Sequence, residues 1–81
     1  MDKQNLQIYR SVVTCDPEIL GGTPVFAGTR VPVRILSDHL EAGDRLDDFL
    51  DNFPSVTRSQ AIRIIKLGLD QFANQGDEIT L

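Results

Sequence analysis

The chain has 81 residues, 41% of them hydrophobic, and twelve acidic against eight basic side chains give it a formal net charge of −4 at pH 7. This length fits one small domain with a modest core, and such a domain is often marginally stable alone and is commonly stabilised by dimerisation. The acidic balance excludes a protein that coats nucleic acid through bulk positive charge. A single cysteine and a single histidine exclude an internal disulfide and a cysteine-based or multi-histidine metal site, so we expect no metal and no cofactor; without a signal peptide or an apolar run of about 20 residues, we expect the cytoplasm.

Residues 1–32 are predicted to form an extended N-terminal arm with a small β-hairpin. Apolar residues alternate loosely in this arm, which is the pattern of a strand, through Leu6, Ile8 and Val12. The stretch GGTPVFAGTRVPV at 21–33 then combines β-favouring residues with turn formers. We expect a short strand over Val25–Ala27 and a tight turn at Gly28-Thr29, where glycine supplies a positive φ at little steric cost.

Residues 33–75 are predicted to form three helices, and residues 76–81 a short tail without an assigned partner. The first helix is expected from about Val33 to Ala42, because its leucines recur at the helical period and a glycine follows it. The second helix is expected from about Arg45 to Asn52, with Asp44 as its N-cap and a proline as its stop.

The third helix carries the clearest signals, from a cap at Thr57 to about Ala73. Thr57 and Gln60 have the spacing of a capping box, in which each side chain bonds the backbone N–H of the other residue. Gly68 lies beside the apolar stripe, which indicates that another element approaches closely there. A continuous buried face is expected from Ala61, Ile62, Ile65, Leu69 and Phe72. The sequence thus predicts a mostly α fold, with a short N-terminal strand and hairpin arm followed by a three-helix bundle.

The outward side of the third helix is the candidate DNA-binding surface. A short capped helix, a tight turn and a longer helix have the proportions of a helix-turn-helix. Away from the core, polar and basic side chains are placed to contact phosphates or base edges, namely Arg58, Ser59, Arg63 and Lys66. The alternative is an ordinary solvated helix face, which Asp70 among the cations slightly favours.

Ile64 and Leu67 are apolar residues outside the main stripe of the third helix. Left in water, they would make a patch for a second copy or another protein to cover, with the hairpin residues Phe26 and Arg30 as further interface candidates. In the alternative, the N-terminal arm folds over Ile64 and Leu67. The guanidinium of Arg30 suits a carboxylate or a phosphate, although we favour a role in pinning the hairpin through nearby carboxylates or carbonyls.

Cys15 and His39 are the residue types of a nucleophile and its base. No orienting residue or oxyanion glycine stands at a fixed offset from them, so a buried thiol and a histidine on the flank of a helix are favoured. We therefore expect no enzymatic activity and name no catalytic residue.

Three segments of the chain together resemble one known family. They are Asp16-Pro17 with the stretch 21–33, then Leu40-Glu41-Ala42-Gly43, then Phe53-Pro54. This pattern closely resembles the domain-of-unknown-function family numbered 433, over about residues 12–72. The resemblance implies a homeodomain-like helix-turn-helix and an antitoxin of a bacterial type II toxin–antitoxin pair, which neutralises a PIN-like ribonuclease toxin from a neighbouring gene and autorepresses its operon. The alternative is a homodimeric protein-interaction module without a DNA-binding role.

Overall fold

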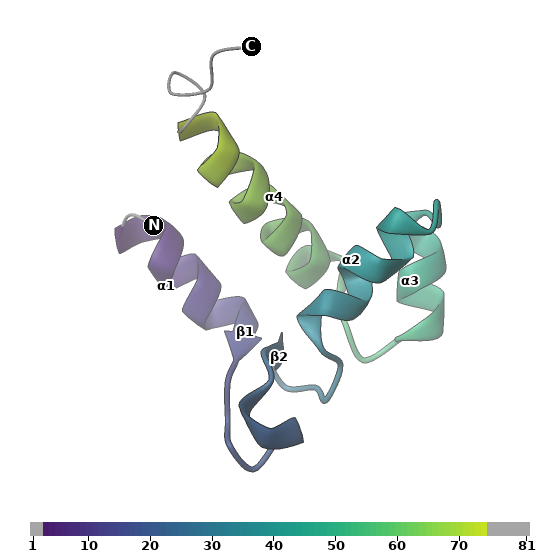
Figure 1. Ribbon diagram of the computed structural model, residues 1–81, viewed down its shortest axis with the longest axis horizontal. Helices are drawn as coiled ribbons and strands as arrows, with labels where there is room; N and C mark the ends of the chain where they lie inside the picture. Colours follow the sequence, from purple (N-terminus) through teal and green to yellow (C-terminus); the bar gives the residue numbers. More distant parts are fainter. Residues whose placement is uncertain (1–2, 75–81) are drawn as a thin grey trace.

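Four helices and one small antiparallel sheet make up residues 3–74, the part of the chain that the computed structural model describes (Figure 1). Side chains are described through residue 71. In chain order the elements are α1 (Lys3–Val12), β1 (Val13–Thr14), a 3-10 turn (Leu20–Gly22), β2 (Val25–Phe26), α2 (Val33–Glu41), α3 (Leu46–Asn52) and α4 (Arg58–Asn74). The predicted mostly α fold with a small β element is confirmed, whereas the predicted tail at 76–81 and the side chain of Phe72 lie outside the described residues.

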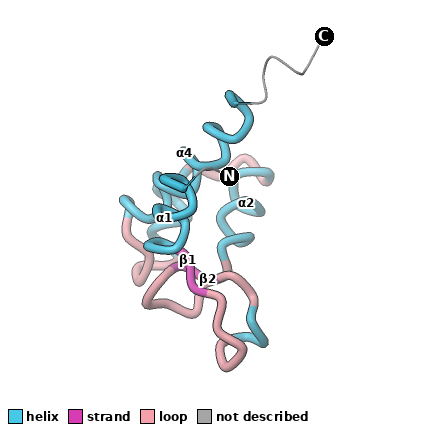
Figure 2. The backbone as a smooth tube through the Cα atoms, turned by 90° about the vertical axis from the view of Figure 1, so that its left-hand side faces the viewer, coloured by secondary structure: helices cyan, strands magenta, loops and turns pink. Residues whose placement is uncertain are grey.

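The helices fall into two pairs. α1 and α4 lie side by side and antiparallel, and α2 packs with α3 beyond the start of α4 (Figure 1). The sheet and the loops on either side of β2 hang below the helices (Figure 2). Within residues 3–74, none of the helices is both long and apolar enough to cross a bilayer.

The N-terminal arm is a helix, so the predicted extended conformation is wrong. Leu6, Ile8 and Val12 fit an alternating pattern, but Ile8, Tyr9 and Val12 also recur at helical spacing. In the fold, Ile8 and Tyr9 lie beside Leu67 of α4, and Val12 is buried. Contact with α4 selects the helix, because an apolar pattern this short does not separate the two periods and an isolated ten-residue helix is marginal alone.

The sheet consists of β1 and β2, of two residues each. They pair in antiparallel register, with Val13 opposite Phe26 and Thr14 opposite Val25. On the other side of β2, the returning chain forms an isolated bridge between Pro32 and Val25. The sheet is therefore as small as the prolines of this stretch predict, but β1 is a partner that the sequence did not indicate.

A tight turn closes the hairpin that follows β2. Gly28 has a φ of 76°, a conformation that suits the third position of a type II turn. Thr29 fastens the turn, since its N–H and its Oγ1 both donate to the Phe26 carbonyl, at 3.0 and 2.8 Å. The Thr29 Oγ1 also accepts from the Val31 N–H at 3.0 Å. The predicted turn at Gly28-Thr29 is confirmed.

The 3-10 turn contains a strained leucine. Leu20, Gly21 and Gly22 have consecutive positive φ angles of 50°, 66° and 94°. A residue with a Cβ in this left-handed region costs about 1–2 kcal/mol. The Leu20 side chain is 48% exposed, so burial does little to offset that cost.

The core lies where β2 meets α2, α3 and the start of α4. Its centre is a pair of fully buried rings, Phe26 and Phe49, whose centroids are 5.9 Å apart. Leu36, Val56 and Ala61 complete the buried cluster. Each of these helices therefore turns one apolar side toward β2, and this packing sets the position at which α4 begins.

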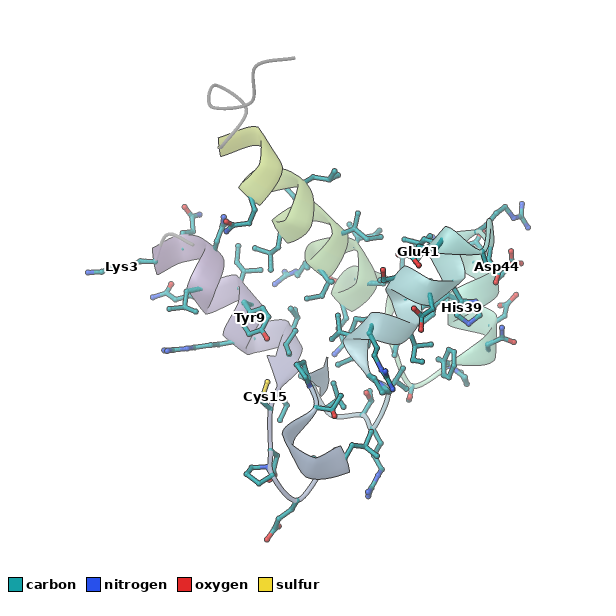
Figure 3. All side chains as sticks on the ribbon, viewed as in Figure 1. Lys3, Tyr9, Cys15, His39, Glu41 and Asp44 are labelled. Carbon is teal, nitrogen blue, oxygen red and sulfur yellow. The ribbon has the colours of Figure 1, made fainter. Side chains whose placement is uncertain are left out.

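The boundary between α2 and α3 follows the sequence signals except at Asp44. Gly43 follows α2, and the Asp44 N–H donates to the His39 carbonyl at 2.9 Å. The prediction that Asp44 caps α3 is wrong, because its Oδ2 accepts from the Nδ1–H of His39 at 2.8 Å (Figure 3). Arg45 takes the N-cap position, and its N–H donates to Asp48 Oδ2 at 2.9 Å. The close of α2 thus places Asp44 beside His39 before α3 begins.

α4 starts with the predicted capping box, which is confirmed. The Gln60 N–H donates to Thr57 Oγ1 at 3.1 Å, and the Thr57 N–H donates to Gln60 Oε1 at 3.0 Å. The remaining amide atom of Gln60, Nε2, donates to the Ala27 carbonyl at 2.9 Å. One side chain therefore caps α4 and ties it to the turn after β2.

The buried face of α4 is narrower than predicted. Ala61 and Ile65 belong to the core region, but Ile62 and Leu69 are 46% and 65% exposed. These two are seven positions apart and share one flank of the helix, which neither α1 nor the core covers. Gly68 also departs from expectation, since nothing lies within 4 Å of the place that a Cβ would occupy. No other element of the described chain approaches this glycine closely.

Candidate nucleic-acid interface

α3 and α4 are joined by residues 53–57, and contacts on both helices hold this unit together. Val56 is 3% exposed, and its N–H donates to the Phe53 carbonyl at 3.0 Å. The Phe53 ring lies 5.2 Å from the Phe49 ring, between centroids. Asp47 in the first turn of α3 forms an ion pair with Arg58 at the start of α4. The direction of α4 relative to α3 is therefore set mainly by packing, and the exposed ion pair adds little to it.

Arg63 and Lys66 lie on the exposed side of α4 and line a cleft of about 500 Å³ between α4 and α1. Neither cation forms an ion pair among the described side chains. Asp70 is the one carboxylate among the residues that line the cleft, which also include Gln4, Asn5, Ile8 and Leu67. Both positive charges are therefore available to an anion from outside this chain.

The sequence interpretation missed the α1 wall of this cleft, because it treated the arm as a strand. The wall consists of Gln4, Asn5 and Ile8, and Asn5 is 8% exposed. The available signal was the recurrence of Ile8 and Val12 at helical spacing, which places the α1 residues that face α4 on one side.

Arg58 is engaged in an ion pair, whereas Ser59 is simply exposed. Arg58 is committed to Asp47, and the hydrogen bond and charge of its guanidinium hold the pKa of that carboxyl below its usual value. Both side chains of this pair are more than half exposed, so an external phosphate can compete for Arg58. Ser59 is exposed on the first turn of α4, on the same side as Arg63 and Lys66.

Leu67 and Ile64 do not form an exposed patch. Leu67 is 5% exposed, on the side of α4 where α1 packs and where Ile8 and Tyr9 line clefts with it, which agrees with the alternative that the N-terminal arm folds over it. Ile64 is half-buried and packs against the core. Leu67 therefore offers no free surface to an interface, whereas Ile64 keeps part of its side chain exposed.

The hairpin candidates Phe26 and Arg30 have opposite surroundings. Phe26 is fully buried in the core, so its side chain is not on the surface. Arg30 is exposed and forms no ion pair among the described side chains. The favoured role for Arg30, pinning the hairpin, falls instead to the hydroxyl of Thr29.

Cys15 and His39 lie in separate parts of the fold (Figure 3). Cys15 is exposed rather than buried as predicted, and it hydrogen-bonds with Tyr9, whose pKa is raised by burial and then by the neighbouring Cys15. His39 packs edge-on against Phe49 and Phe53, at centroid distances of 5.6 and 5.8 Å. The structure does not bring these two residues together as a nucleophile and base.

A second concave surface, which we name the α2–α4 groove, lies on another side of α4. Its volume is about 710 Å³, and most of its lining is aliphatic. The residues that line it are Val33, Arg34, Leu36, Ser37, Leu40 and Glu41 from α2, and Ile64, Ile65, Gly68 and Leu69 from α4. Among residues 3–71, no cluster of three or more histidine, cysteine or acidic side chains is arranged to hold a metal ion.

Comparison with known proteins places this fold among proteins of unassigned role. The family described as "Protein of unknown function (DUF433)" matches residues 13–66. The "Uncharacterized protein y4eO" of Sinorhizobium fredii (strain NBRC 101917 / NGR234) is 40% identical over 63 residues, which is 78% of this chain but 28% of that protein's length. The crystal structure of a DUF433 member from Anabaena variabilis ATCC 29413 aligns with a TM-score of 0.60 at 19% identity, over 93% of this chain and 70% of that one. This last likeness shows the fold alone.

Proposed function

The chain belongs to the DUF433 family, and from this premise we propose that it is the antitoxin of a bacterial type II toxin–antitoxin pair. In this proposal it acts in the cytoplasm as a homodimer, neutralises a PIN-like ribonuclease toxin and represses its own operon. The family description assigns no function. The toxin partner is supported by the resemblance of the family to antitoxins, and DNA binding is supported by the geometry of α3 and α4.

The proposed DNA-binding unit is a homeodomain-like helix-turn-helix made of α2, α3 and α4. α3 has 7 residues and α4 has 17, which are proportions in which the longer, second helix enters the major groove. The capping box and the Gln60 bond to Ala27 hold the start of α4, where such a helix meets base edges. A rigid start is useful, because the register of the contacts depends on it.

The observation that carries the proposal is the free pair of cations on α4. The chain has a net charge of −4, yet Arg63 and Lys66 are exposed and lack ion-pair partners among the described side chains. Phosphates supply most of the affinity in DNA binding, and they are neutralised by such uncommitted lysines and arginines. The charge of this helix face is therefore available to the phosphates of a nucleic acid.

Each side chain has a defined part in the proposed complex. Arg63 and Lys66 contact phosphates on the walls of the major groove, and Ser59 donates to a phosphate or a base edge near the start of α4. Arg58 exchanges Asp47 for a phosphate oxygen, which costs little because the pair is solvent-exposed.

The proposed toxin contact is Arg30. It lies on a turn fastened by Thr29, it is exposed, and it has no carboxylate partner among the described residues. An exposed guanidinium on such a turn suits the carboxylate cluster of an acidic-site nuclease. Binding of Arg30 to that carboxylate cluster would block the active site of the nuclease.

The test is a gel shift with the DNA upstream of this chain's own gene, at low and at physiological salt. Lys66→Glu should weaken the shift at least about tenfold and reduce the salt slope, since each phosphate contact contributes about 0.9 to it. Lys3→Glu is the matched control, because it makes the same charge change on α1 and Lys3 points away from α4 (Figure 3). No shift at low salt, with or without the neighbouring gene's product, would remove the DNA-binding proposal.

A second candidate function is a protein-interaction module without a DNA role. The acidic net charge and the aliphatic α2–α4 groove favour it. Co-expression with the neighbouring gene separates the two candidates: this module would bind that product and shift no DNA. An Arg30→Glu variant that still binds and inhibits the product would clear Arg30 of the toxin contact.

A further inference from the structure

Packing within the described part of the chain does not require a glycine at position 68. It lies inside the 17-residue helix α4, where glycine in place of alanine costs about 0.5–1 kcal/mol. Nothing lies within 4 Å of the position of a Cβ there, so the chain itself does not require the missing side chain. Gly68 lines the α2–α4 groove and also a smaller cleft shared with Tyr9 of α1, so a group that enters the groove finds room beside it.

The edges of the groove expose apolar side chains that the fold leaves uncovered. Leu69 on α4 is 65% exposed and Leu40 on α2 is 42% exposed. They rise beside a floor that includes Leu36, which is buried, and Ile65. This surface can pack against a second copy of itself, because the leucines on the edge of one copy fit the concave aliphatic floor of the other.

The charged residues of the groove are complementary under a two-fold rotation. Arg34 and Glu41 are exposed, line the groove and form no ion pair among the described side chains. They are seven positions apart on α2, which places them about 10 Å apart along one side of the helix. In a symmetric pair with antiparallel helices, residue i of one copy meets residue j of the other and the reverse. Arg34 of each copy then meets Glu41 of its partner.

We propose that the α2–α4 groove is the interface through which two copies of this chain associate about a two-fold axis, with α2 antiparallel to the α2 of the partner. Leu69 of each copy enters the groove of the other beside Gly68, and two Arg34–Glu41 pairs close the rim. This interface accounts for the homodimer of the proposed function. The inference rests on that homodimer alone and does not require DNA binding.

The cationic face of α4 stays free in such a dimer. Lys66 and Gly68 are two positions apart, which is about 200° around the helix. The centre of the dimer surface therefore points away from the Arg63–Lys66 face, and the two come near each other only at Leu69, which is three positions, or about 60°, from Lys66. Both copies would keep their cations exposed.

The interface is tested by sedimentation equilibrium of the full chain over a range of concentrations. Leu69→Glu should weaken the dimer at least about 30-fold, because it replaces an apolar side chain buried in the partner's groove with a charge. Ile62→Glu is the matched control, since Ile62 is 46% exposed on the same flank of α4 but lies about 10 Å nearer its start, where it does not line the groove. Equal dissociation constants for Leu69→Glu and Ile62→Glu would overturn the choice of surface.

A charge exchange tests the antiparallel arrangement separately. Arg34→Glu and Glu41→Arg should each weaken the homodimer about tenfold, because both rim pairs become like-charged, and the double variant should recover. The two single variants mixed together should form a heterodimer, in which both rim pairs are again opposite in charge. No recovery in the double variant and no heterodimer would overturn the arrangement.

The outcomes separate this inference from the proposed function. A chain that stays monomeric at all concentrations would overturn both the interface and the homodimer of the proposed function. A dimer whose dissociation constant is unchanged by the groove variants would overturn the interface alone. The gel shift of each variant, measured at a concentration above its dissociation constant, reports DNA binding independently of either result.

Discussion

Removing the Gln60 side chain tests how firmly α4 is held against the turn after β2. The amide accepts from the Thr57 N–H and donates to the Ala27 carbonyl. Each bond is worth about 1 kcal/mol net, so Gln60→Ala should lower the free energy of unfolding by about 2 kcal/mol. For a domain of this size that corresponds to a fall in Tm of roughly 10 °C.

Two further variants divide this loss between the cap and the cross-link. Gln60→Glu keeps an acceptor for the Thr57 N–H but loses the donor to the Ala27 carbonyl, so it should cost about 1 kcal/mol or less, because an acidic residue in the first turn also gains from the helix dipole. Ser59→Ala is the neighbouring control, for which we expect a change within about 0.5 kcal/mol.

The measurement is urea unfolding followed by circular dichroism, with thermal scans at one fixed protein concentration. If Gln60→Ala and Ser59→Ala unfold within about 0.5 kcal/mol of each other, the amide contributes nothing beyond its exposed surface. The position of α4 would then be set by the core residues alone, and the reasoning from Gln60 would be refuted.

Leu67→Ala should cost about 2–3 kcal/mol, at the low end for a buried leucine because clefts adjoin it, and hydrogen exchange should show earlier opening of α1; unchanged exchange in α1 would contradict the contact. Leu20→Asn should raise the free energy of unfolding by up to about 1 kcal/mol, since asparagine tolerates a positive φ, and a destabilised variant would show that the leucine packs usefully. The pKa of Asp47, followed by NMR, should lie below the usual value and rise toward it in Arg58→Ala. Because the folded pKa is depressed, the pair stabilises the fold above the usual aspartate pKa and is lost as the pH falls through the folded value, so the two proteins should differ in stability at neutral pH and converge in acid.

Local signals in the sequence predicted the parts of the fold that short-range chemistry decides. The box formed by Thr57 and Gln60, the turn at Gly28-Thr29 and the limits of α2 each depend on neighbours within a few residues. Local signals failed at Asp44, because whether this residue caps α3 or bonds His39 depends on the path of the chain after α2. α1 shows the same limit on a larger scale, since its helical conformation depends on the surface of α4.

The candidate site was predictable in part. The helical period placed Arg63 and Lys66 on an outward face, and both are exposed. It could not show that Arg58 pairs with Asp47, because they stand eleven positions apart with a turn between them. It also could not show that α1 covers Leu67 or that Leu69 stands at the edge of a groove, since both depend on which neighbours pack on either side of α4.

The contact between α1 and the later turns of α4 links two segments that flank the region shared with the family, residues 13–66. Each of these segments buries apolar side chains of the other, and they meet at Leu67. The two segments should therefore be kept or replaced together. Grafting the shared region into another protein requires both segments or neither, because one without the other leaves an aliphatic strip in water.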